Sequence, residues 1–95
     1  MTMKFGGYAP QVIARRTERF EGIELEGVRE ADGHCEVDNE TPEFFSVYLR
    51  LKPEGDDVGA RCVGDFETHG EATAYAESLA RQYGWRIRDK AQVPA

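Results

Sequence analysis

The sequence predicts an α+β domain, in which an antiparallel sheet of about four to five strands is covered on one face by one main helix at about 68–83. Residues 44–51 alternate between two sets of side chains at the strand period of two. Residues 72–83 instead repeat apolar side chains at the helical spacing of three and four. A further alternating run at 85–88 predicts a short closing strand after the helix.

The main hairpin is predicted between Glu43 and Phe66. Its first strand has one face formed by Phe45, Val47, Leu49 and Leu51, and a second face formed by Phe44, Ser46, Tyr48 and Arg50. Residues 52–57 contain the proline and glycine that are typical of a loop. In the second strand, one side is expected to bear Val58, Ala60, Cys62 and Phe66, and the other Arg61, Val63 and Asp65.

The main helix has recognisable start and stop signals. Thr68-His69-Gly70-Glu71 fits a capping box, in which the threonine hydroxyl accepts a hydrogen bond from the Glu71 backbone N–H and the Glu71 carboxylate reaches back. Gly84 stands where a left-handed C-terminal cap is favoured. The stripe that faces the sheet is predicted to contain Ala72, Tyr75, Ala76, Leu79 and Tyr83.

Weaker strand signals occur before this hairpin. Residues 12–14 and 23–25 contain β-branched side chains, and each segment is predicted to be a strand. Asp32-Gly33 predicts a tight turn that joins a strand ending near Ala31 to an extended piece at 35–37.

Length and composition restrict the class of protein. The 95 residues carry a net charge of −6 and 40% hydrophobic side chains, which is typical of one globular domain, 1–95, and excludes large multidomain enzymes. We expect a loose arm at 1–10 and a frayed tail at 90–95. No segment has the apolar length of a membrane helix or of a signal-peptide core, so we expect a cytoplasmic protein whose Cys35 and Cys62 stay thiols.

Negative charge is concentrated in one window. Between Glu18 and Glu43 ten acids accompany two arginines, a net charge of −8, whereas the rest of the chain carries +2. We expect a partner-binding surface for a basic protein, formed by Glu21, Glu24, Glu26, Glu30, Asp32, Glu36, Asp38 and Glu40. Glu24 and Glu26 would share one strand face, where a positively charged partner would relieve their repulsion.

Such a surface would act by occupancy. Its apolar centre is expected at Phe20, Ile23 or Leu25. Against a nucleic-acid-binding complex, the carboxylates would compete with phosphates for arginines and lysines, which is the action of a DNA mimic or inhibitor.

Three other interpretations stay open. Charge windows are usually solvated faces that keep a small protein soluble. A sheet face with Phe44, Tyr48 and Arg50 beside Arg61 and Val63 would stack single-stranded nucleic-acid bases, although the net charge of −6 disfavours direct nucleic-acid binding. An open sheet edge would allow a homodimer.

The sequence predicts no enzyme, no cofactor and no metal site. The side chains of metal-ligand type, His34, Cys35, Cys62 and His69, lack the spacing of structural zinc. The strand-to-helix junction is crowded with Asp65, Glu67, His69 and Glu71, and the preference of acids for helix starts explains them without acid–base chemistry. The sequence contains no nucleophile elbow, phosphate loop or metalloprotease motif.

The second half of the chain combines the runs Phe45-Ser46-Val47-Tyr48-Leu49-Arg50, Cys62-Val63-Gly64-Asp65-Phe66 and Thr68-His69 with Ala72, Tyr75-Ala76, Leu79-Ala80 and Tyr83-Gly84-Trp85. This combination resembles small uncharacterised accessory proteins of bacterial plasmids and integrative elements. The resemblance implies that a mobile genetic element encodes the protein, and it supplies no catalytic residues. In its organisation the chain also resembles small acidic anti-CRISPR proteins, which are built from a sheet with one or two helices.

Overall fold

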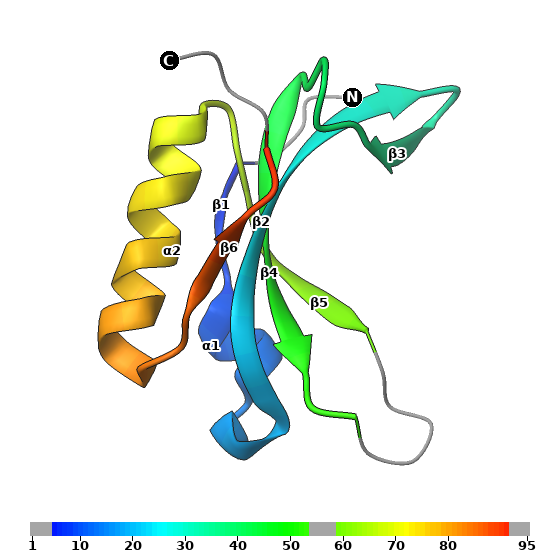
Figure 1. The fold of residues 1–95 in the computed structure, drawn as a ribbon. Helices are drawn as coiled ribbons and strands as arrows, with labels where there is room; N and C mark the ends of the chain where they lie inside the picture. Colours follow the sequence, from blue (N-terminus) through cyan, green and yellow to red (C-terminus); the bar gives the residue numbers. More distant parts are fainter. Residues whose placement is uncertain (1–4, 54–58, 92–95) are drawn as a thin grey trace.

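The computed structural model describes residues 5–53 and 59–91, which form one sheet, one long helix and two short helical segments (Figure 1). The strands are β1 (Gly6–Gly7), β2 (Phe20–Ala31), β3 (His34–Val37), β4 (Phe44–Leu51), β5 (Ala60–Phe66) and β6 (Ile87–Asp89). The helical segments are α1 (Ala9–Ile13), the 3-10 turn η1 (Thr17–Arg19) and α2 (His69–Tyr83). The predicted α+β class, main hairpin, main helix and closing strand are confirmed. Residues 54–58, with most of the expected loop and Val58, lie outside the described residues.

The sheet is mixed and mostly antiparallel, in the order β1-β5-β4-β2-β3. The last strand, β6, runs parallel to β2 and pairs with its residues 23–25, whereas β3 pairs with 28–31. Since β4 pairs with the other edge of β2, β3 and β6 follow one another along a single edge of that strand. One long strand therefore connects the hairpin, the middle of the sheet and the closing strand.

The apolar core lies between the sheet and α2 (Figure 1). Its strand side chains include Ile23, Leu25, Val47, Leu49 and Val63, and its helix side chains are Ala72, Ala76 and Leu79. We call the opposite face of the sheet the open face; it bears Glu24, Glu26, Ser46, Tyr48 and Cys62.

The caps of α2 confirm the predicted boundaries. Thr68 is the N-cap, and its hydroxyl accepts a hydrogen bond from Glu71 N at 3.2 Å. The Glu71 carboxylate reaches back to the same hydroxyl, which donates to it at 3.0 Å. Gly84 ends the helix with φ of 78°, the left-handed conformation that glycine adopts at little cost.

The β2–β3 turn is also confirmed. Asp32 and Gly33 both have positive φ, 50° and 83°, as a tight turn between two twisted strands requires. Below the turn, Gly27 allows a close crossing of the chain: a Cβ atom here would lie 2.8 Å from the Asp38 carbonyl oxygen and 2.6 Å from Pro42. The segment that leaves β3 therefore packs directly on the backbone of β2.

The predicted strand at residues 12–14 is wrong, because residues 9–13 form α1. Pro10 stands in the first turn, where a missing N–H is tolerated, and it disfavours a strand ladder. Ala9 and Ile13, four residues apart, are both buried in the core, which is the helical spacing. With β1 paired to β5, the described part of the expected arm, residues 5–10, packs on the domain.

The predicted assignment of the second-strand residues to the two faces of the main hairpin is also wrong in part. The pairing register shifts between Val47 and Tyr48, so that Cys62 lies opposite Tyr48. Val63 is fully buried in the core, and Arg61 lies opposite Leu49 on the helix side of the sheet. A bulge adds one residue to a strand and reverses the alternation beyond it, which period-two counting does not detect.

Replacing the N-cap should weaken the domain. We expect Thr68→Ala to lower the free energy of unfolding by about 1 kcal/mol, because the Glu71 backbone N–H loses its acceptor. Urea denaturation would measure the change, with Ser78→Ala on the exposed side of α2 as the control. Equal stabilities of the two variants would show that the cap contributes nothing.

Candidate functional site

The acidic residues predicted to bind a partner do not form one surface. Glu24 and Glu26 lie in the middle of the open face, and Glu21 lies near the start of β2, where the pairing register shifts. The others gather around the β2–β3 turn and the loop that follows, and they are Glu30, Asp32, Glu36, Asp38 and Glu40. The structure thus divides the predicted site into Glu21 by itself, a central pair, and a terminal group of five.

An intramolecular cation supplies the charge that Glu24 and Glu26 were expected to find in a partner. Lys90 Nζ lies 3.0 Å from Glu24 Oε2 and 3.8 Å from Glu26 Oε1. Arg50 adds a longer contact, 3.9 Å, to the same Glu24 oxygen. Glu24 is only 8% exposed, and the Lys90 backbone N–H donates to Leu25 O, so the end of β6 holds the lysine in place. The start of the expected frayed tail is therefore bound to β2, and residues 92–95 lie outside the described part.

The terminal group makes a strongly negative projection, which we call the acidic hairpin, residues 29–43. It contains six carboxylates, on Glu30, Asp32, Glu36, Asp38, Glu40 and Glu43, together with Arg29 and His34. Figure 1 shows β3 and its turn extending away from the side of the sheet that packs on α2. With His34 counted as neutral, the acidic hairpin has a net charge of −5, and most of its side chains are exposed.

Some acids of the acidic hairpin have structural roles. Asp38 accepts hydrogen bonds from the backbone N–H groups of Thr41 and Glu40, and from the Thr41 hydroxyl. These bonds, the Thr41 bonds above all, lower the pKa of Asp38, and Arg29 at 3.6 Å adds to the effect. Glu36 lies 3.0 Å from His34. Glu30 and Glu40 instead point carboxylates to solvent without an ion pair among the described residues.

The expected apolar centre of the binding surface is wrong. Phe20, Ile23 and Leu25 are each 1% exposed and belong to the core. An exposed apolar side chain is found instead on β3, where Val37 is 53% exposed. Val37 pairs with Val28, which pairs with Phe44, and these two neighbours are buried, so Val37 is the exposed end of an apolar row.

A second feature, which sequence analysis missed, is a polar network on the open face. Ser46 Oγ donates to Asp65 Oδ1 at 2.5 Å, and the Cys62 thiol donates to the same oxygen at 3.6 Å. The Tyr8 hydroxyl donates to Cys62 Sγ at 3.2 Å. Only the bulge in β5 brings Cys62 and Asp65 to one face, so residue spacing alone gave no signal for this network.

The network is not arranged as a nucleophilic site. Burial, above all, raises the pKa of the Cys62 thiol, so the thiol is protonated at neutral pH. Burial also raises the pKa of Tyr48 to about 12, and that of Tyr8 well above its usual value. The hydrogen bonds connect Tyr8, at the start of α1, with β4 and β5.

The other candidate residues are dispersed. Cys35 and Cys62 are free thiols, and the order β5-β4-β2-β3 separates their strands by about 14 Å, at roughly 4.8 Å per strand. His69 contacts Asp89 at 2.7 Å and the Phe45 ring, whereas Asp65 faces the network on the opposite side of the sheet. Within residues 5–53 and 59–91, no three side chains of ligand type form a group able to hold a metal ion.

Side chains of both charge signs surround Tyr48 on the open face. Tyr48 is half-buried, and it lies between Glu24 and Cys62 in the sheet register. Three carboxylates, on Glu24, Glu26 and Asp65, share this face with the cations of Lys90 and Arg50, both of which lie within ion-pair distance of Glu24. In the described ranges, no helix is long and apolar enough to cross a membrane.

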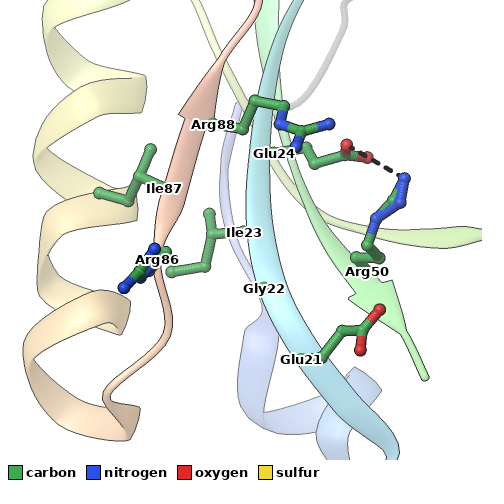
Figure 2. A pocket seen from close by; sticks show the side chains of 8 residues that line it. All are labelled: Glu21, Gly22, Ile23, Glu24, Arg50, Arg86, Ile87 and Arg88. Atoms are coloured by element: carbon green, nitrogen blue, oxygen red, sulfur yellow. Dashed lines mark ion pairs between the residues drawn. The ribbon is translucent and has the colours of Figure 1, made fainter.

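A hollow of about 280 Å³ lies beside β6 (Figure 2). Gly22, which has no side chain, and Ile23 line it from β2, and Arg50 from β4. Glu21, Glu24, Arg86, Ile87 and Arg88 complete the lining. Figure 2 shows Arg88 and Arg50 on either side of Glu24, and Ile87 and Ile23 pointing to the other side of the sheet.

Comparison with known proteins gives no further guide to this surface: no family model, curated protein or solved structure matches the chain.

The ion pair at the centre of the open face should stabilise the domain. We expect Lys90→Ala to lower the free energy of unfolding by about 1–3 kcal/mol at neutral pH, because Glu24 is left buried without its nearest cation. Lys52→Ala, at an exposed lysine, should change it by less than about 0.5 kcal/mol. Denaturant unfolding would compare them.

A second substitution separates the ion pair from packing. Adding Glu24→Gln to Lys90→Ala should recover part of the loss, since an amide is less costly to bury than an unpaired carboxylate. The effect of Glu24→Gln on the free energy of unfolding would be measured in the wild type and in Lys90→Ala. Equal effects in the two backgrounds would show that the two residues do not interact.

Proposed function

We propose that this protein is a non-enzymatic interaction module of the cytoplasm, which binds a basic protein surface through the acidic hairpin and acts by occupying that surface. The observation that supports this most is the projection of six carboxylates with a net charge of −5 around the exposed Val37. Charge of one sign concentrated on a projecting element attracts a partner of opposite sign over a distance of about 10 Å at moderate salt.

Charge and apolar contact would have separate roles in this binding. The carboxylates would raise the association rate, and the exposed Val37 would supply apolar contact. Glu30 and Glu40 are suited to the first role because neither is engaged in an ion pair within the described part of the chain.

The partner we propose is a nucleic-acid-binding or defence complex. Arginines and lysines that bind phosphates also bind carboxylates, so the acidic hairpin would compete with nucleic acid for them. The resemblance to accessory proteins of mobile elements and to small acidic anti-CRISPR proteins supports such an inhibitor, encoded by a mobile genetic element.

A charge reversal with a matched control tests the proposal. The double variant Glu30→Lys and Glu40→Lys changes the net charge from −6 to −2, and so does Glu67→Lys with Glu77→Lys at exposed positions away from the acidic hairpin. Tagged wild-type protein and both variants would be used to retain partners from nuclease-treated bacterial lysate at low and moderate salt.

We expect the wild type and the Glu67, Glu77 variant to retain the same stoichiometric basic protein, which added duplex DNA displaces. The Glu30, Glu40 variant should bind it at least tenfold more weakly, because two steering carboxylates become repulsive. Equal weakening in both variants would assign the effect to net charge alone and would contradict a role of the acidic hairpin.

A further inference from the structure

The closing strand β6 leaves one of its edges open. Among the described residues it pairs only with β2, in a parallel ladder. Arg86 O accepts from Ile23 N, and Lys90 N donates to Leu25 O, so these groups point to β2. In a parallel ladder the groups of alternate residues point to opposite edges, which turns the N–H and C=O of Ile87 and Asp89 outward.

The side chains along this edge are basic and apolar. Neither Arg86 nor Arg88 forms an ion pair with another described residue, and Ile87 is 36% exposed. The one acid of the strand is already engaged, since Asp89 lies 2.7 Å from His69 and also accepts from Ala91 N. Lys90 is paired with Glu24. The free charge at the edge is therefore positive.

Space for further side chains lies next to the same strand. Arg86, just before β6, and Arg88, within it, line the hollow in Figure 2. Arg50 lines it from β4, on the other side of β2. A Cβ atom at Gly22 would meet nothing closer than Arg86 O at 3.8 Å, so the absence of a side chain here leaves room over the sheet.

We propose that β6 accepts an extended acidic segment of a partner protein as an additional strand of the sheet. Residues opposite Arg86 and Arg88 would be acidic, and the residue between them, opposite Ile87, would be apolar. Main-chain hydrogen bonds to Ile87 and Asp89 would supply affinity, and the alternating side chains would supply specificity. This surface is separate from the acidic hairpin and does not rest on the function proposed for it.

A second copy of this chain fits the edge less well. Antiparallel pairing of two β6 strands centred on Ile87 would place Arg86 opposite Arg88, and pairing centred on Arg88 would place Arg86 opposite Lys90. Like charges directly opposite one another destabilise a sheet. An acidic strand meets no such repulsion.

A peptide titration followed by NMR tests the proposal. The probe is a five-residue peptide of alternating glutamate and valine with blocked ends, and its control is the same peptide with lysine in place of glutamate. We expect saturable shifts of the backbone amides of residues 86–90 with the first peptide and none with the second. Wild-type protein titrated alone, by dilution, would report any self-association.

Two substitutions separate charge from strand addition. Ile87→Pro removes an outward N–H and leaves the bonds of Arg86 and Lys90 to β2, so it should weaken binding about tenfold, whereas Ile87→Val should change it less than twofold. Arg86→Gln with Arg88→Gln should also weaken binding about tenfold, and Arg81→Gln on α2 less than twofold.

Unfolding curves of all variants would confirm that each remains folded. Equal binding of the glutamate and lysine peptides, or equal affinity of the Ile87→Pro and Ile87→Val variants, would overturn the proposal. Shifts confined to residues 29–43 would also overturn it, because the peptide would then bind elsewhere.

Discussion

Backbone pairing along β2 is the constraint on which the other parts of this structure depend. One edge of this strand pairs with β4 over residues 20–28, and the other edge pairs first with β6 and then with β3. Both short strands are held in place by that second edge. Gly27 lies at the change from one to the other, where the Asp38 N–H and the Asn39 side chain bond to its backbone. A side chain at this position would displace the segment that leads out of β3.

The same pairing decides which charges are free. Lys90 reaches Glu24 and Glu26 only because β6 runs parallel to β2 and ends beside them. A central acidic pair is thereby neutralised inside the domain, although its residues contribute to the most negative window of the sequence. The acids beyond residue 28 lie on a projection without such a cation at its centre. Exposed negative charge is thus a property of the fold more than of local composition.

Local chemistry made much of the fold predictable. The Thr68 cap, the Gly84 stop and the Asp32-Gly33 turn each satisfy a backbone requirement within a few residues, so sequence indicates them directly. Two features depended on distant residues: the bulge at Val63, which changed the face of Cys62, and α1, where burial of Ala9 and Ile13 outweighs a β-branched pattern. For the same reason, the acidic window could be identified but its division could not, because the Lys90 contacts span more than sixty residues.

The placement of the two remaining charged surfaces has a further consequence. The acidic hairpin lies along the same edge of β2 as Arg86 and Arg88. Surfaces of opposite charge are therefore separated by a few residues of a single strand. Between them, the Asp38 N–H and the Asn39 side chain are bonded to Gly27, and Lys90 N is bonded to Leu25 O, so their spacing is fixed by the sheet. A partner that engaged both surfaces would have to match this fixed spacing. Two copies aligned in parallel would bring like charges together at both surfaces, which disfavours that arrangement of a dimer.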